Sequence, residues 1–155
     1  MIKRTILAAT LVPLAGLLQN TGLFSVLGIK PNLLLAVLVA ASFFVTSFPV
    51  FIFLVVESIL FLRFESGFQL DLLIWVFLLA IFYFIGRVLP WRQSVNNLAL
   101  AASAIIIFYL IADFGYLIGA PLAVGMEIFY TSIFSLLFYD LLRQLGDNEE
   151  NIFKR

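Results

Sequence analysis

The sequence predicts an all-α integral membrane protein: a bundle of about six transmembrane helices, with short second and third helices and both termini inside. Of its 155 residues, 64% are hydrophobic and only 12% are charged, whereas a soluble domain carries about 25% charged residues. Six helices of roughly 20 apolar residues each occupy about 120 positions, which leaves too little chain for a soluble domain. We therefore predict a single polytopic membrane domain over residues 1–145 and a short polar cytoplasmic tail over 146–155.

The residue types that the chain lacks narrow its chemistry. It has no cysteine and no histidine, and nine Lys and Arg balance nine Asp and Glu. This composition excludes disulfides, thiolate and imidazole metal ligands and the Ser-His-Asp triad, and it gives no basis for nucleic-acid binding. Neither Asp113 nor Asp140 lies in the local motif of an intramembrane aspartyl protease. We expect no catalytic residue, no cofactor and no metal, and hence a protein that is not an enzyme.

The first predicted helix covers residues 5–27. Lys3 and Arg4 before an apolar run resemble the start of a signal peptide, but the run lasts about 22 residues and lacks a small-x-small cleavage site. We therefore expect an uncleaved transmembrane helix, kinked at Pro13.

The next apolar stretch, residues 32–62, is too long for one helix. A straight helix of that length would measure about 46 Å, against about 30 Å for the hydrocarbon core of a bilayer. Pro31 suits the first position of a helix, and the segment 47–49 interrupts the stretch. We predict two short helices, 31–46 and 49–62, and a re-entrant hairpin stays open as an alternative to two full spans.

Three longer helices complete the prediction. A polar break at 63–67 precedes the fourth helix, which ends at Pro90-Trp91-Arg92, an aromatic and basic signature of the membrane interface. A turn at 119–121 separates the fifth helix from the sixth, and the charged tail is expected to fray. These three predicted helices cover residues 70–89, 98–118 and 121–142.

Basic residues predict the orientation, because cytoplasmic loops of membrane proteins are rich in Lys and Arg. With six spans, the side of the two termini holds Lys3, Arg4, Arg87, Arg92, Arg143, Lys154 and Arg155. The opposite side holds Lys30 and Arg63. We therefore predict that both termini are cytoplasmic, and a re-entrant pair would leave the same residues on the same sides.

Ionisable residues at membrane depth are costly, and for that reason they are functional candidates. Glu57, Asp71, Asp113 and Glu127 fall in the middle or outer half of the predicted helices, and Arg63 is their nearest basic residue. Three interpretations stay open. The carboxyl groups form an outward-facing acidic pocket that binds a solute or relays protons, they are hydrated or hydrogen-bonded within the bundle, or they contact a partner's helix.

Helical spacing places small and polar residues on shared faces, as in helices that pack within membranes. Two such faces are formed by Asn32, Ala36 and Ala40 in the second helix and by Glu127, Thr131 and Ser135 in the sixth. We expect partners to bind mainly through the small and polar faces of the first three helices, while phenylalanines cover lipid-facing surface. The candidate partner-contact or intramembrane polar residues are Gln19, Asn20, Pro31, Asn32, Ala36, Ala40, Glu57, Asp113 and Glu127.

The order of short motifs along the chain resembles that of a bacterial family. These motifs are the helix end Leu-Leu-Gln19-Asn20, the turn into Pro31-Asn32-Leu-Leu-Leu, Glu57 in a third apolar segment, the loop residue Gly67, and the final Leu-Phe-Tyr-Asp-Leu-Leu-Arg143. The pattern is similar to the rod shape-determining protein MreD family and covers essentially the whole chain. Members of that family typically carry Asp at the positions of Asn32 and Glu57 and glycines near the latter, whereas residues 48–62 here contain no glycine.

The resemblance implies a non-enzymatic membrane scaffold of the machinery that inserts peptidoglycan along the side wall of rod-shaped bacteria, and so a role in cell shape. It implies a multi-pass protein of the bacterial cytoplasmic (inner) membrane that binds an MreC-like bitopic protein and, through it, MreB and the RodA–penicillin-binding protein synthase. The alternative is the substrate-binding membrane subunit of an energy-coupling-factor-type vitamin transporter. Such subunits also have six helices in a small chain, and MreD-like proteins are similar to them in fold.

Overall fold

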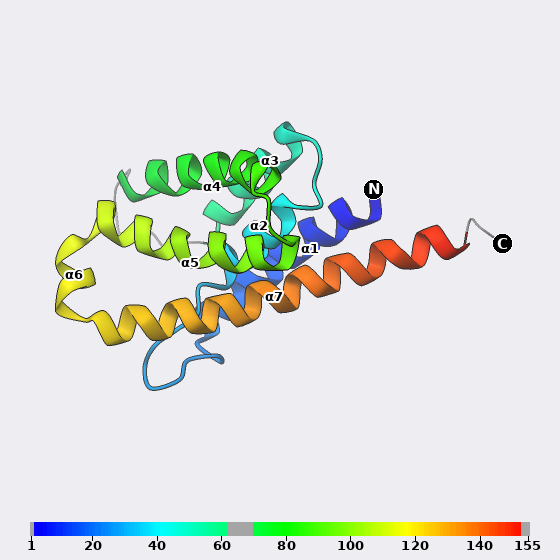
Figure 1. The fold of residues 1–155 in the computed structure, drawn as a ribbon. Coiled ribbons are helices and arrows are strands. Elements are labelled where there is room, and N and C mark those ends of the chain that lie inside the picture. The colour runs from blue at the N-terminus through cyan, green and yellow to red at the C-terminus, as the bar shows by residue number, and fades with distance from the viewer. Residues whose placement is uncertain (1, 62–69, 153–155) are drawn as a thin grey trace.

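The computed structural model describes residues 2–61 and 70–152, and this part of the chain is all-helical, as predicted (Figure 1). Apart from a single isolated bridge between Val26 and Ile29, the described residues contain no β-structure. The helices are α1 (Ile2–Thr21), α2 (Leu33–Ser42), α3 (Phe48–Ile59), α4 (Leu70–Val88), α5 (Gln93–Ala112), α6 (Phe114–Gly119) and α7 (Pro121–Ile152).

The shortest of the apolar core helices, α2, lies at the centre of the bundle. All ten of its residues are buried, and it contacts α1, α3, α4, α5 and α7. Figure 1 shows α4, α5 and α7 running along the length of the molecule, with the start of α1 and the last turns of α7 at the same end. Since α2 is about 15 Å long at 1.5 Å per residue, it covers roughly half the thickness of a bilayer core.

The connection from α1 to α2 differs from the prediction at both ends. The first helix stops at Thr21 rather than at residue 27, because Gly22, Leu27 and Gly28 take positive φ angles of 70°, 55° and 80° and turn the chain. The second helix starts at Leu33, so Pro31 precedes the helix instead of opening it.

The N-cap of α2 is Asn32, whose side-chain oxygen accepts a hydrogen bond from the Leu35 N–H at 3.0 Å. An Asn side chain at this position satisfies one of the free N–H groups at a helix start. This cap, not Pro31, therefore sets where the helix begins.

The turn between α2 and α3 is held by two side chains of α4. The Tyr83 hydroxyl donates to the Thr46 carbonyl at 2.6 Å, and the Arg87 guanidinium donates to the Val45 carbonyl at 2.8 Å. Arg87 also lies over the Tyr83 ring, with 3.5 Å between the guanidinium carbon and the ring centroid. These bonds satisfy carbonyls that the ends of two short helices would otherwise leave unpaired.

Two further corrections concern the last third of the chain. The predicted helix 98–118 is broken at Asp113, whose side chain accepts from the Tyr116 N–H at 2.9 Å and caps the separate helix α6. The polar tail continues α7 as far as Ile152 instead of fraying from Gly146. It contains no proline, and one glycine in a helix costs only about 1 kcal/mol.

Some predicted features lie outside the described residues. These are the polar break at 63–67 with Arg63 and Gly67, and the final residues 153–155. The backbone of Asp71 belongs to α4, but its side chain also lies outside the description.

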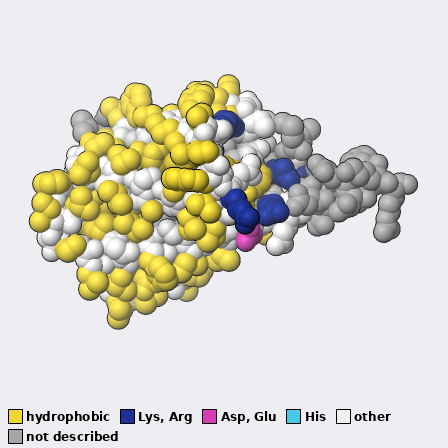
Figure 2. Space-filling view, viewed as in Figure 1, with side chains coloured by type: hydrophobic (Ala, Val, Ile, Leu, Met, Phe, Trp, Pro, Cys, Tyr) yellow, Lys and Arg dark blue, Asp and Glu magenta, His cyan; other side chains and the backbone are white. Residues whose placement is uncertain are grey.

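Buried polar side chains and exposed apolar stripes accompany the largely apolar core. Asn96, Asn97, Thr131 and Ser135 are buried at the centre. Large apolar side chains are exposed in helical stripes, among them Leu73, Phe77, Ile81, Phe84 and Val88 of α4 and Phe129, Ile133, Leu137 and Leu141 of α7. Figure 2 shows hydrophobic side chains over most of the visible face and basic side chains at one end.

Two helices of the described chain are long and apolar enough to cross a membrane. They are α5, Gln93–Ala112, and the segment Pro121–Gln144 of α7. By this criterion of length and composition, α2, α3 and Leu72–Val88 of α4 count as shorter apolar helices.

Candidate ligand pocket

A pocket of about 340 Å³ opens between the loop before α2 and the helices α1, α5, α6 and α7. It lies at the end of the bundle away from the N-terminus and the last turns of α7, since α6 and the start of α7 form its wall (Figure 1). Its lining residues are Gln19, Gly28, Ile29, Lys30, Pro31, Asn32, Tyr109, Tyr116 and Glu127. The volume is in the usual range for small-molecule sites, roughly 300–1,000 Å³.

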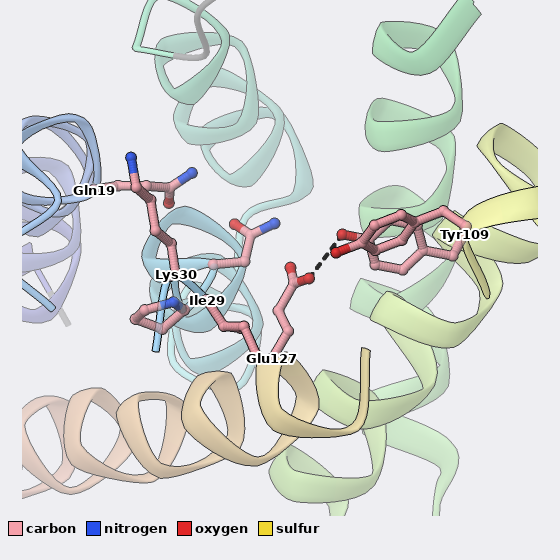
Figure 3. A pocket seen from close by; sticks show the side chains of 9 residues that line it. Gln19, Ile29, Lys30, Tyr109 and Glu127 are labelled. Atoms are coloured by element: carbon pink, nitrogen blue, oxygen red, sulfur yellow. Dashed lines mark hydrogen bonds between the residues drawn. The ribbon is translucent and has the colours of Figure 1, made fainter. Parts of the chain in front are cut away.

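One wall of the pocket is built around a carboxyl group and two tyrosines. The Tyr109 hydroxyl donates to Oε2 of Glu127 at 2.7 Å, and Figure 3 shows the two side chains pointing toward one another from α5 and α7. The ring of Tyr116 packs on that of Tyr109, with 5.2 Å between centroids. Asp113 places Tyr116 there by capping α6. The bond leaves Oε1 of Glu127 as an acceptor for a ligand.

The opposite wall carries two amide side chains held by the start of α2. Oε1 of Gln19 accepts from the Leu34 N–H at 3.1 Å, and Oδ1 of Asn32 accepts from the Leu35 N–H at 3.0 Å. Because both oxygens bind backbone, the two NH₂ groups remain as donors. The pocket therefore places neutral donors opposite a carboxyl group.

Lys30 adds a positive charge to the same pocket. It follows Gly28 and Ile29 in the loop, and Figure 3 shows its side chain next to Gln19, across from Glu127. With the two amides, Lys30 and the Glu127 carboxyl group form a lining that suits a small polar solute with both donors and acceptors. Among the residues that the structure describes, no cluster of three acidic side chains could hold a metal ion.

Four of the residues singled out in the sequence come together here. Gln19, Pro31, Asn32 and Glu127, which are up to 108 positions apart (127 − 19), line the one pocket.

The acidic pocket, one of the three interpretations left open for the carboxyl groups, is not formed by the described side chains. Of the described carboxylates expected to form it, only Glu127 lines the pocket, and Asp113 is a helix cap on the exposed surface. Glu57 is in α3 and does not line the pocket, and its buried Oε2 has no hydrogen-bond partner among the described atoms. Similar depth along different helices does not bring these carboxyl groups together, because their side chains point in different directions.

Asn20, Ala36 and Ala40 have structural contacts elsewhere. The Asn20 amide donates to the Phe61 carbonyl at 3.0 Å and ties α1 to the end of α3. Ala36 and Ala40 are fully buried. A partner could reach them only if α2 left the bundle.

The two small and polar faces of the second and sixth predicted helices pack against one another. The Asn32 N–H donates to Oγ1 of Thr131 at 2.9 Å, and Oγ of Ser135 donates toward the Ala36 carbonyl at 3.3 Å. Oγ of Ser135 also lies 3.1 Å from Oδ1 of Asn97 in α5. Asn32 and Ala36 therefore meet Thr131 and Ser135, so this chain's own helices occupy these parts of the two faces.

Five pocket residues were not singled out as site candidates from the sequence: Gly28, Ile29, Lys30, Tyr109 and Tyr116. A signal for the tyrosines exists, because a spacing of seven residues places them on one side of a helix near its outer end. Lys30 entered the prediction only through the orientation, although a basic residue on the outer side is also able to bind a ligand.

Comparison with known proteins adds no family. No family model, no curated protein and no solved structure matches this chain. The functional argument therefore rests on the residues and their geometry.

Proposed function

We propose that the chain is a multi-pass membrane protein. The observation that carries this proposal is the distribution of side chains: stripes of large apolar residues are exposed on α4 and α7, while Asn96, Asn97, Thr131 and Ser135 are buried. In water these stripes would be an aggregation hazard, whereas in lipid they face hydrocarbon and the polar groups join helices inside the bundle.

In this proposal α1, α2, α3, α4, α5 and α7 make six passes, with both termini in the cytoplasm. The turn between α2 and α3 supports two crossings by this pair, because it lies beside two basic residues of the predicted cytoplasmic side. Val45 accepts from Arg87, and Arg4 lies over the Phe44 ring at 5.2 Å. Lys30, predicted to be outside, lies in the pocket at the other end.

Single cysteines test this topology, since the natural chain contains none. Leu23→Cys lies in the exposed loop after α1, and Gln144→Cys lies on the exposed surface of α7. In intact spheroplasts a membrane-impermeant maleimide should label Leu23→Cys, and it should label Gln144→Cys only after lysis. Labelling of Gln144→Cys before lysis contradicts the proposed orientation.

For the biological role we propose a non-enzymatic membrane scaffold of the cell-wall elongation machinery, as the resemblance to MreD-like proteins implies. The structure is compatible with this role because large apolar side chains are exposed along α4 and α7. A partner would therefore meet the protein mainly through exposed apolar side chains. The partner expected from the resemblance is an MreC-like bitopic protein, whose single helix suits such contacts.

Co-purification in mild detergent with the MreC-like protein of the same host tests the scaffold role. We expect a stoichiometric complex with the MreC-like protein. An unrelated single-span protein with the same tag is the control and should form no complex. If the chain elutes alone at detergent and salt concentrations where the MreC-like protein stays intact, the scaffold role is wrong.

The pocket favours a second candidate, a solute-binding membrane subunit of the vitamin-transporter type. Lys30, Glu127 and the Gln19 and Asn32 amides could hold a small polar molecule from the outer side. Mass spectrometry of denatured protein, purified without added ligand, would then detect a retained molecule. Glu127→Gln should reduce its retention, while Glu57→Gln, outside the pocket, should not; equal retention in both variants excludes this role.

A further inference from the structure

A second and larger pocket, about 580 Å³, lies at the opposite end of the bundle. It is formed where the start of α1, the end of α2, the start of α5 and the late part of α7 meet. Its polar lining consists of Arg4, Arg92, Gln93, Ser94, Tyr139 and Arg143. No local sequence pattern predicts that these three arginines, which are up to 139 positions apart (143 − 4), converge.

Three guanidinium groups from three separate elements line this pocket. Arg4 comes from the first turn of α1, Arg92 from the N-cap of α5, and Arg143 from α7. Arg4 is held over the Phe44 ring, 5.2 Å from its centroid. Guanidinium groups bind phosphate oxygens in pairs of parallel hydrogen bonds, more specifically than ammonium groups do.

The start of α5 adds neutral donors to the same space. The Tyr139 hydroxyl donates to Oε1 of Gln93 at 3.0 Å, which leaves the Gln93 amide NH₂ as a donor. Arg92 occupies the N-cap without a side-chain hydrogen bond to the helix. The first-turn N–H groups, including that of Ser94, therefore have no capping side chain and favour an anion.

In the membrane placement proposed above, the side chains around this pocket fit headgroup depth. Trp91, next to Arg92, is 58% exposed, and exposed tryptophans are typical of the membrane–water interface. Basic side chains gather at this end of the molecule in Figure 2. The acidic side chain nearest to Arg143 along α7 is the exposed Asp140, one turn earlier.

We propose that this pocket binds a phosphate group, either the headgroup of an anionic lipid or a soluble phosphate compound. Both sources share the chemistry that the arginines recognise. The volume exceeds what a single phosphate needs, so the glycerol or sugar next to the phosphate also fits. The proposal is independent of the scaffold and solute-binding roles and uses only the placement in a membrane.

Arg92 is the residue on which to test the site. Arg4, Tyr139 and Arg143 make further interactions within the chain, so their replacement would also disturb the fold. Arg92 is exposed, and Arg92→Gln should therefore leave the melting temperature unchanged. Lys30→Gln is the charge-matched control, because it removes one positive charge at the other end of the bundle.

Native mass spectrometry of the full chain in neutral detergent measures binding of phosphatidylglycerol and of phosphatidylcholine. We expect the anionic lipid to bind preferentially and Arg92→Gln to lower its affinity about tenfold, the effect of one charge-assisted hydrogen-bond pair. Arg92→Lys keeps the charge but not the paired bonds and should lose part of the affinity. Lys30→Gln should bind like the natural protein.

Inorganic phosphate and glycerol 3-phosphate separate the two sources. If either displaces the lipid, or binds alone with the same loss in Arg92→Gln, the site takes a soluble phosphate; if neither does, it takes the lipid headgroup. Unchanged lipid affinity in Arg92→Gln overturns the proposal when neither soluble probe binds. An equal loss in Lys30→Gln also overturns it, because the attraction would then come from net charge alone.

Discussion

The two short helices α2 and α3 differ in what surrounds them, although both are strongly apolar. Every residue of α2 is buried. In α3 the buried residues are Phe51, Leu54, Val55 and Ser58, while Phe53 is 64% exposed and Val56 is 50% exposed. The helix α2 is therefore at the centre of the bundle, whereas α3 is at its periphery with one face exposed.

The difference follows from side-chain size and polar partners rather than from hydrophobicity. Ala36, Ala40 and Ala41 of α2 let neighbouring backbones approach closely, and α7 supplies hydrogen-bonding side chains at the matching positions. The α3 sequence instead has phenylalanines at 48, 51 and 53, which need room on at least one side. Within a membrane, where lipid is as apolar as leucine, packing decides which helix becomes central.

The strongest test of this comparison is Ala36→Leu in α2. Three added carbons at a fully buried position against α7 should lower the free energy of unfolding by about 3 kcal/mol. Equilibrium unfolding in mixed micelles measures the change. Val56→Leu on the exposed face of α3 is the control and should be neutral; equal effects in both would contradict the central position of α2.

The next largest effect is expected at Gly16, where α1 approaches the end of α3. A Cβ atom there would lie 2.4 Å from Cβ of Phe61, a position that rotation of the Phe61 side chain cannot relieve. Gly16→Ala should therefore lower the unfolding free energy by about 2 kcal/mol. Gly125→Ala, where an added Cβ meets nothing within 4 Å, should show no loss; a similar loss there would mean that the effect is not steric.

Ser135→Ala should have a smaller effect. It removes the hydroxyl that links α7 to the Ala36 carbonyl and to Asn97, with little change in volume. Such hydrogen bonds within membranes contribute about 1 kcal/mol. Ser132→Ala, on a less buried part of the same helix, is the matched control. A larger loss of stability in Ser132→Ala than in Ser135→Ala would contradict the polar contact between Ser135 and α2.

The smallest effect is expected for Phe53→Leu in α3. This side chain points away from the bundle, so the unfolding free energy should change by less than about 0.5 kcal/mol. A loss of unfolding free energy above about 2 kcal/mol would show that a second molecule covers this face. The unfolding free energy would then depend on protein concentration, which measurement at two concentrations would detect.

Much of the helical order was predictable from local sequence. Residues 70–89 were predicted as a helix, and α4 is Leu70–Val88. Two of the errors occur where a single side chain starts a helix, as Asn32 does before α2 and Asp113 does before α6. Caps of this kind depend on one hydrogen bond, which hydropathy does not reveal.

The candidate pocket was predictable only in part. Glu127, Gln19 and Asn32 stand out as polar residues in apolar segments. Tyr109 and Lys30 do not, because tyrosines and lysines near membrane interfaces are common. Only the folded chain shows that Tyr109 donates to Glu127.

By itself the sequence determined that the chain is helical and apolar, with basic residues grouped on one side, because these properties depend on neighbouring residues and their transfer between water and lipid. The tertiary structure decided which faces meet. It joined the Asn32–Ala36 face to Thr131 and Ser135, which lie 99 positions further along the chain, and it brought Arg4 beside Arg143 in one pocket. Such contacts depend on the complementary shapes of distant segments, and no local pattern records them.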